Sequence, residues 1–269
     1  MGFSKKLMIG AIAAFLGVAA SGFDNSDFFN VHKDYANQGD VPSQFNAGWG
    51  LSNGIGTKKN VGQGLSYYRQ AANKGNEIAM FYLGLDFESK RRYNEAMVWY
   101  KKAADSKAGH EVAMFKVAEF YRQKKDWKNA AAYYKKSAMK GYMPAQFEYA
   151  EFCAMGTGVP MNWKEAVSWY QKAAHNVAYG SAGYTKAQFR LAECYEKGHG
   201  VAKNQKKAVE YYQKAAAGEH AEAQFRLAGC YENGNGIAKN RDWAVYWYRK
   251  AAANGHKKAK DALNKYGLN

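Results

Sequence analysis

Proline and cysteine are both scarce in this sequence of 269 residues, which has three of each. So few prolines exclude a Pro-rich linker. An odd number of cysteines sets no obvious disulfide framework. The six histidines show neither an i, i+4 pair nor a His/Cys ligand spacing, so we expect no metal site and no cofactor.

A long apolar run is also missing near the start of the chain. Lys5 and Lys6 precede 14 apolar or small residues, 7–20, and residues 18–22 are all small or apolar. A membrane-spanning helix needs about 20 such residues. The pattern is instead typical of a secretory signal peptide over residues 1–22. We expect cleavage between residues 20 and 23, no integral membrane span, and a mature chain that is periplasmic or secreted.

Acidic residues are outnumbered: 39 Lys and Arg stand against 23 Asp and Glu, a formal charge of +16. Removal of Lys5 and Lys6 leaves +14. In the cytosol such a charge would indicate nucleic acid as a partner. For an exported chain we expect no nucleic acid, and favour a protein with an acidic surface or an anionic envelope polymer.

The sequence repeats itself. The stretch that opens at Ala187, AQFRLAECYEKGHG, returns 36 residues later from Ala223 as AQFRLAGCYENGNG. The same frame starts near residues 43, 79, 113, 145, 187 and 223. Each copy has phenylalanine at its third position: Phe45, Phe81, Phe115, Phe147, Phe189 and Phe225. Each copy also ends near an aromatic pair, such as Tyr211-Tyr212. A period of this length indicates a repeat architecture.

Each repeat reads as two helices joined by a turn. Ala187, Leu191 and Tyr195 recur every four residues, which places them on one stripe of a first helix. A Gly-x-Gly turn follows, and a second amphipathic segment ends at Gly218. A lone pair of short helices cannot bury its apolar face, so the units must stack. We therefore predict an all-α solenoid of six repeats over residues 43–256, with capping helices over 23–42 and 257–269.

The runs A-x-F-x-L-A-x-x-Y-x-x-G-x-G-V and A-V-x-W/Y-Y-x-K-A-A resemble the Sel1-like repeat family, relatives of the tetratricopeptide repeats. Together with the signal peptide, they resemble an exported bacterial type of this family. The resemblance implies a right-handed solenoid whose first helices line a concave groove, and a protein that binds other proteins. Two departures stand out. The second and third repeats lack the Gly-x-Gly turn, and the fourth gains six residues around 175–183, which we interpret as a protruding loop.

A candidate binding face follows from the helical period. Position 1 is the residue that opens each frame. At about 100° per residue, positions 1, 5 and 9 form the core stripe, and positions 4 and 7 point away from it. The residues at positions 4 and 7 differ between repeats, and the resemblance places them in the groove. We predict partner binding by Trp49, Tyr82, Lys116, Glu119, Glu148, Glu151, Arg190, Glu193 and Arg226.

The same frame predicts energetic roles. Leu191→Ala should cost ~2–5 kcal/mol as a core truncation, and Arg190→Ala under ~0.5 kcal/mol as a surface change. The lysines near second-helix ends are interpreted as a solvated face. Cys153, Cys194 and Cys230 are interpreted as small buried residues, and His220 with His256, which share one slot, as structural.

One short motif suggests chemistry. Ser137 and Lys140 spell S-x-x-K, the nucleophile motif of β-lactamases and penicillin-binding proteins, but no K-T-G or S-D-N partner motif is present. We therefore predict a non-catalytic interaction scaffold in the envelope or outside the cell, in one variant an immunity protein against a toxin. A cell-wall-directed or β-lactamase-like enzyme and a binder of an anionic polymer stay open as alternatives.

Overall fold

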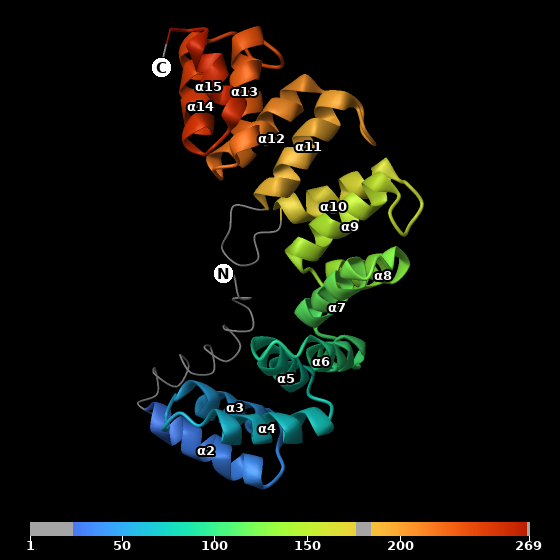
Figure 1. Cartoon of the computed structure of the whole chain (residues 1–269), viewed down its shortest axis with the longest axis vertical. Coiled ribbons are helices and arrows are strands. Elements are labelled where there is room, and N and C mark those ends of the chain that lie inside the picture. The colour runs from blue at the N-terminus through green and yellow to red at the C-terminus, as the bar shows by residue number, and fades with distance from the viewer. Residues whose placement is uncertain (1–23, 176–183, 268–269) are drawn as a thin grey trace. The chain divides into compact units, whose positions relative to one another are not determined.

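The computed structural model describes residues 24–175 and 184–267, which form fourteen α-helices and their short connections (Figure 1). These residues belong to two compact units, one within Met1–Asp126 and one within Trp127–Asn269. No helix in the described ranges has the length and apolar character needed to cross a bilayer. The predicted signal peptide and most of the predicted loop at 175–183 lie outside the described residues.

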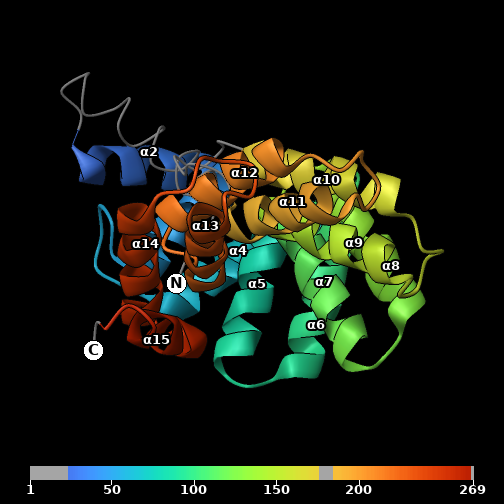
Figure 2. The same cartoon turned by 90° about the horizontal axis from the view of Figure 1, so that it is seen from above.

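The first unit contains α2 (Asn25–Asn37), α3 (Val41–Asn53), α4 (Val61–Asn73), α5 (Glu77–Ser89), α6 (Tyr93–Asp105) and α7 (Glu111–Gln123). The second contains α8 (Trp127–Met139), α9 (Met143–Met155), α10 (Trp163–His175), α11 (Thr185–Lys197), α12 (Gln205–Ala217), α13 (Ala221–Asn233), α14 (Arg241–Ala253) and α15 (Lys257–Asn264). Within each unit, consecutive helices pack against one another. Figure 2 shows one such pair, α5 and α6, joined by a short loop. The predicted all-α repeat fold is confirmed.

The residue that opens most of the frames lies at the centre of the packing. Ala79, Ala113, Ala145, Ala187 and Ala223 are all fully buried. A methyl side chain at this position lets neighbouring helices approach closely, and larger side chains fill the space beside it. Leu191 and Tyr212 are also fully buried. The predicted core stripe is therefore correct.

The start of a first helix is held by the side chain that precedes it. Asp40, Asn76, His110 and His220 each accept a hydrogen bond from the backbone N–H three residues later. These bonds satisfy one of the free donors at a helix N-terminus. The imidazole of His220 also stacks on Phe189, with ring centroids 4.7 Å apart. Capping and stacking together confirm the structural interpretation of this histidine.

The connections between the two helices of a repeat come in two lengths. Four of them have seven residues: 54–60, 156–162, 198–204 and 234–240. The second glycine of each long turn packs on the backbone of the preceding second helix. A Cβ on Gly200, for example, would lie 2.3 Å from the Trp163 carbonyl oxygen. The second and third repeats have only three connecting residues, 90–92 and 124–126.

Candidate partner-binding face

The predicted face consists of first-helix side chains at positions 4 and 7, and we call it the 4/7 face. In the first unit it is carried by α3, α5 and α7, and in the second by α9, α11 and α13. At two junctions, position 7 of one repeat contacts position 4 of the next. Trp49 donates a hydrogen bond to Tyr82 in this way, and Arg190 is bonded to Glu151. Each unit therefore contains one junction at which neighbouring residues of the 4/7 face are in direct contact.

The aromatic part of the 4/7 face is partly buried. Trp49 and Tyr82 pack against a core cluster that includes Phe45 and Tyr68. The Tyr82 ring centroid lies 5.4 Å from that of Tyr68 and 5.6 Å from that of Phe45. Burial raises the pKa of Tyr82 above its usual value of 10.0. Both side chains are partly exposed and also stabilise the first unit by packing against its core.

Glu151 departs from the prediction, because it is only 9% exposed where the helical period placed an accessible side chain. Tyr170 is buried, and its hydroxyl donates a hydrogen bond to Oε1 of Glu151. Arg190 Nη2 donates to its Oε2 at 2.8 Å, while Nη1 reaches Glu193 Oε2 at 3.0 Å. Burial disfavours the charge on Arg190, but attraction to these carboxylates outweighs it and raises the arginine pKa.

The reason for this burial lies at position 10 of the first helix. In the second, fifth and sixth repeats that position is a glutamate: Glu88, Glu196 and Glu232. Each accepts a hydrogen bond from the tyrosine that ends the aromatic pair of its repeat, Tyr100, Tyr212 and Tyr248, at 2.5, 2.9 and 2.7 Å. In the fourth repeat position 10 is Ala154. The hydroxyl of Tyr170 is therefore paired with Glu151 at position 7 instead.

Lys116 makes an equivalent link in the first unit. Its Nζ lies 2.8 Å from Glu88 Oε1 and 3.0 Å from Oε2, joining the third repeat to the second. Burial would raise the pKa of Glu88, but the hydrogen bonds from Lys116 and Tyr100 outweigh it and hold that pKa below 4.5. Sequence reasoning missed Glu88 and Tyr100, although the recurrence of glutamate at position 10 was a readable signal.

Three further residues, Glu119, Glu193 and Arg226, form ion pairs within their own helices. Glu119 is bonded to Arg122 at 2.6 Å, and Arg226 to Glu222 at 2.9 Å. Glu193 is additionally bonded to Lys197 at 3.2 Å. Glu148 is partly exposed, and its charge adds to the effect of burial in raising the pKa of Tyr184. Apart from Glu151, every predicted residue of the 4/7 face retains some exposed surface.

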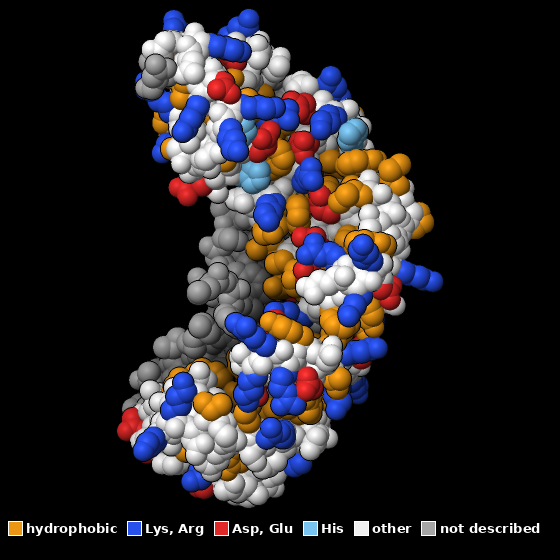
Figure 3. Space-filling model, viewed as in Figure 1, with side chains coloured by type: hydrophobic (Ala, Val, Ile, Leu, Met, Phe, Trp, Pro, Cys, Tyr) orange, Lys and Arg blue, Asp and Glu red, His pale blue; other side chains and the backbone are white. Residues whose placement is uncertain are grey.

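The lysines of the second helices have a different setting. Four of them lie over the aromatic ring three residues earlier: Lys102 over Trp99, Lys136 over Tyr133, Lys172 over Trp169 and Lys214 over Tyr211, at 3.7–4.9 Å from the ring centroid. Such cation–π contacts use the lysine to cover an apolar face. On the side shown in Figure 3, basic side chains lie scattered among acidic and apolar ones.

The serine of the S-x-x-K motif and the three cysteines are buried. Ser137 is fully buried, which does not fit a nucleophile that must reach a substrate. Cys153, Cys194 and Cys230 are free thiols that are 5% exposed or less, as the sequence predicted. Burial raises the pKa of Cys194 to about 12 and that of Cys230 to about 11, so both favour the unreactive thiol. Within residues 24–175 and 184–267 no cluster of potential metal ligands is present.

Comparison with known proteins agrees with this architecture. A family model described as Sel1 repeat matches residues 41–76, 78–107, 112–142, 144–176, 185–220 and 221–256, one range for each predicted repeat. A solved structure of a protective antigen from uropathogenic Escherichia coli strains is 27% identical with a TM-score of 0.85, covering 95% of this chain. A Sel1 repeat protein from Oxalobacter formigenes is 26% identical with a TM-score of 0.66, covering 98% of this chain and 77% of that one.

The alignments also differ in how much of each relative they cover. This chain spans 56% of the Escherichia coli protein. A putative sel1-like repeat-containing protein, L21 of Acanthamoeba polyphaga mimivirus, is 32% identical over 76 residues. That alignment covers 28% of this chain and 14% of the viral protein. The chain therefore spans about half the length of one relative and a small part of the other.

Proposed function

Since the chain belongs to the Sel1 repeat family, we propose that it is an exported, non-catalytic scaffold that binds another protein through its 4/7 face. Sel1 and tetratricopeptide-like repeats form scaffolds that typically bind proteins. One observation carries the choice of face. At one junction in each unit, position 7 of a repeat contacts position 4 of the next, so these side chains are held in place before a partner binds. Ordered side chains lose little entropy on binding.

The composition of the 4/7 face differs between the units. Trp49 and Tyr82 supply aromatic surface in the first unit, whereas Arg190, Glu193 and Arg226 supply charged groups in the second. Aromatic residues and arginines are enriched among the side chains that dominate binding energy. The second unit has 22 Lys and Arg against 11 Asp and Glu. We therefore propose a partner whose surface is acidic where it meets the second unit.

Export is supported by residues 1–22 and by one relative. Lys5 and Lys6, the short apolar run and the small residues at 18–22 form the pattern of a cleaved signal. The Escherichia coli protein with a TM-score of 0.85 is described as a protective antigen, and antibodies reach antigens outside the cytoplasm. A narrower role as an immunity protein against a toxin rests on family analogy alone. N-terminal sequencing of the periplasmic or secreted protein should begin near residues 21–23; a mature protein that still starts at Met1 contradicts export.

Site-specific photo-cross-linking in living cells tests the 4/7 face. A photoreactive amino acid is placed at Glu119, Arg226 or Glu148, and at three second-helix lysines as matched controls: Lys101, Lys172 and Lys250. All six side chains are at least partly exposed, so the substitutions should leave folding intact. We expect discrete cross-linked bands from the 4/7 positions and none from the controls, with the partner identified by mass spectrometry.

Cross-links at the control lysines would contradict the proposal. If cross-links form only at the second-helix lysines, the 4/7 face is not the binding surface. If a pull-down with the purified protein also loses the bound material in about 0.5 M salt, an anionic polymer is the better candidate, because such binding depends on exposed charges that salt screens. A purified protein that hydrolyses a β-lactam, and loses this activity on Ser137→Ala, would contradict the non-catalytic assignment.

A further inference from the structure

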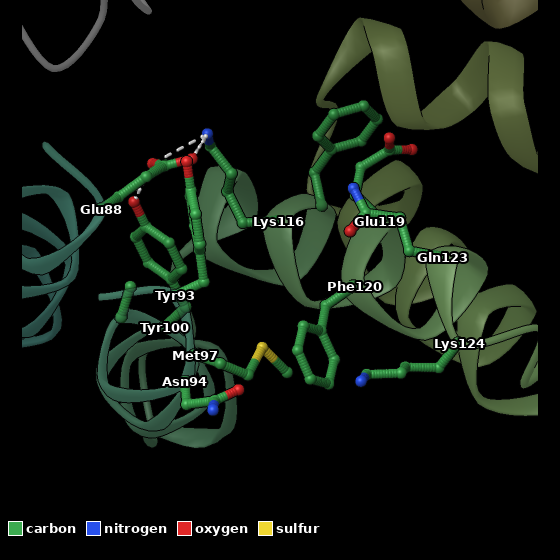
Figure 4. Close-up of a pocket in the computed structure, with 12 residues that line it drawn as sticks. Glu88, Tyr93, Asn94, Met97, Tyr100, Lys116, Glu119, Phe120, Gln123 and Lys124 are labelled. Atoms are coloured by element: carbon green, nitrogen blue, oxygen red, sulfur yellow. Dashed lines mark hydrogen bonds and ion pairs between the residues drawn. The ribbon is translucent and has the colours of Figure 1, made fainter. Parts of the chain in front are cut away.

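The junction between the second and third repeats contains an open pocket of about 620 Å³. It lies wholly within the first unit, between α6 and α7, and adjoins the 4/7 face at Lys116 and Glu119 (Figure 4). Its volume is in the range of sites that hold small ligands or large side chains, ~300–1,000 Å³.

The pocket has a clear structural origin. At the equivalent junction of the fourth and fifth repeats, the seven-residue connection 198–204 packs on the start of α10. The His199 ring packs there against Trp163 with ring centroids 4.5 Å apart, and the space that is left measures about 170 Å³. The third repeat has only residues 124–126 in place of that connection. Tyr93, the counterpart of Trp163, is consequently 59% exposed.

The walls of the pocket are aromatic and sulfur-containing. Met97 of α6 and Phe120 of α7 face one another, with Tyr93 beside Tyr100 at the far side (Figure 4). Methionine is flexible and polarizable, so it adapts to apolar groups of different shape. The surface is thus suited to a bulky apolar or aromatic group.

The charged residues that line the pocket differ in whether they have an ion-pair partner. Lys116 and Tyr100 both bind Glu88, which completes one ionic cluster at the pocket edge. Glu119 is bonded to Arg122. Lys124 lies with its ammonium 5.6 Å from the centre of the Phe120 ring, and it forms no ion pair with any described residue. A cation without a carboxylate partner therefore stands beside the apolar wall.

We propose that this pocket receives a large apolar side chain from a segment of the partner protein, with an adjacent carboxylate of that segment on Lys124. The proposal rests on the proposed function, since the occupant belongs to a protein partner. The apolar group replaces the turn that fills the equivalent junctions. The carboxylate complements the one unpaired cation of the lining among the residues described here. The first unit would thereby select partners by a short acidic and aromatic sequence.

Disulfide tethering tests the pocket without knowledge of the partner. A Gln123→Cys variant places a thiol at the exposed rim, while the three native cysteines are buried and unreactive. Three probes share one disulfide linker: acylated phenylalanine with a free carboxylate, its carboxamide, and acylated alanine with a free carboxylate. Lys197→Cys is the matched control, because Lys197 occupies the same position at the filled junction. Intact-protein mass spectrometry measures the labelled fraction in competing thiol.

With Gln123→Cys we expect the phenylalanine probe to be captured about tenfold better than the alanine probe, as burial of a phenyl ring predicts. The carboxylate should improve capture roughly two- to fivefold over the carboxamide, the usual effect of a partly exposed ion pair. Adding Lys124→Ala should abolish the carboxylate preference and keep the preference for the ring. With Lys197→Cys the three probes should be captured equally.

Equal capture of all three probes by the Gln123→Cys variant overturns the proposal that the pocket receives a large apolar side chain. If the phenylalanine probe is preferred, but capture is the same for the carboxylate and the carboxamide and does not change on Lys124→Ala, the proposed contact between a carboxylate and Lys124 is wrong. If Gln123→Cys disturbs folding, Asn94→Cys offers a second exposed attachment point on the opposite wall. The probes need no partner, so their failure is separable from that of the cross-linking experiment, which reports on the 4/7 face as a whole.

Discussion

Three basic residues at position 4, Arg190, Lys116 and Arg226, form ion pairs with carboxylates that differ in solvent exposure. The side chain of Glu151, which binds Arg190, is 11% exposed. That of Glu88, which binds Lys116, is 33% exposed, and that of Glu222, which binds Arg226, is 38% exposed. We predict that alanine substitution destabilises the protein in the order Arg190, Lys116, Arg226. This prediction differs from the expectation from sequence, which is a loss under ~0.5 kcal/mol for Arg190→Ala.

The magnitudes follow from the exposure of both partners. Breaking a fully buried ion pair costs ~3–5 kcal/mol, because a charge is left without a partner. Arg190 itself is 43% exposed, so water can enter where it was removed. We expect ~1.5–3 kcal/mol for Arg190→Ala and about 1 kcal/mol for Lys116→Ala, since Glu88 keeps the hydrogen bond from Tyr100. Arg226→Ala should cost under ~0.5 kcal/mol, as exposed helical pairs do.

Urea denaturation followed by circular dichroism measures these losses. A double-mutant cycle with Glu151→Gln isolates the pair, because glutamine still accepts the hydrogen bond from Tyr170 but carries no charge. We expect Arg190→Ala to cost ~1–2 kcal/mol less in the Glu151→Gln background.

Two results would refute the reasoning. One is a loss for Arg190→Ala no larger than that for Arg226→Ala. The other is a coupling energy that is zero within error. In either case the ion pair between Glu151 and Arg190 would contribute no more to stability than an exposed surface pair does.

Two further predictions concern pH and backbone geometry. Burial lowers the pKa of His110 to about 4 from its ordinary 6.5, so the unfolded chain binds the proton first and stability falls as pH drops through this interval, by up to about 3 kcal/mol. His110→Asn, which can cap α7 without titrating, should flatten the difference between melts at pH 7 and pH 4.5; an unchanged pH dependence contradicts the assignment. Gly200→Ala should cost more than ~3 kcal/mol, because its Cβ would lie 2.3 Å from a carbonyl oxygen at φ +69°. Gly255→Ala, at φ +86° with nothing within 4 Å, should cost only ~1–2 kcal/mol, and equal losses in thermal melts would show that the turn does not pack as described.

The sequence by itself determined the fold. Phenylalanine at position 3 and the aromatic pair recur in six copies, alanine opens five of them, and the structure contains the corresponding helices. These signals are local, because a helix of thirteen residues shows its buried stripe through its own period. The Gly-x-Gly turns likewise mark where first helices end. The burial of Leu191 and of the three cysteines was predictable for the same reason.

Only the tertiary structure showed which partners the charged residues of the 4/7 face have. The period of one helix shows which residues point away from its own core, but not which groups a neighbouring repeat places opposite them. Arg190 and Glu151 are 39 residues apart, and their contact depends on how α9 and α11 pack. Tyr170 buries Glu151 because Ala154 at position 10 offers no carboxylate. The pocket beside Phe120 arises in the same way: the sequence shows a short connection, but only the packing of α7 on α6 shows the space that the missing turn leaves open.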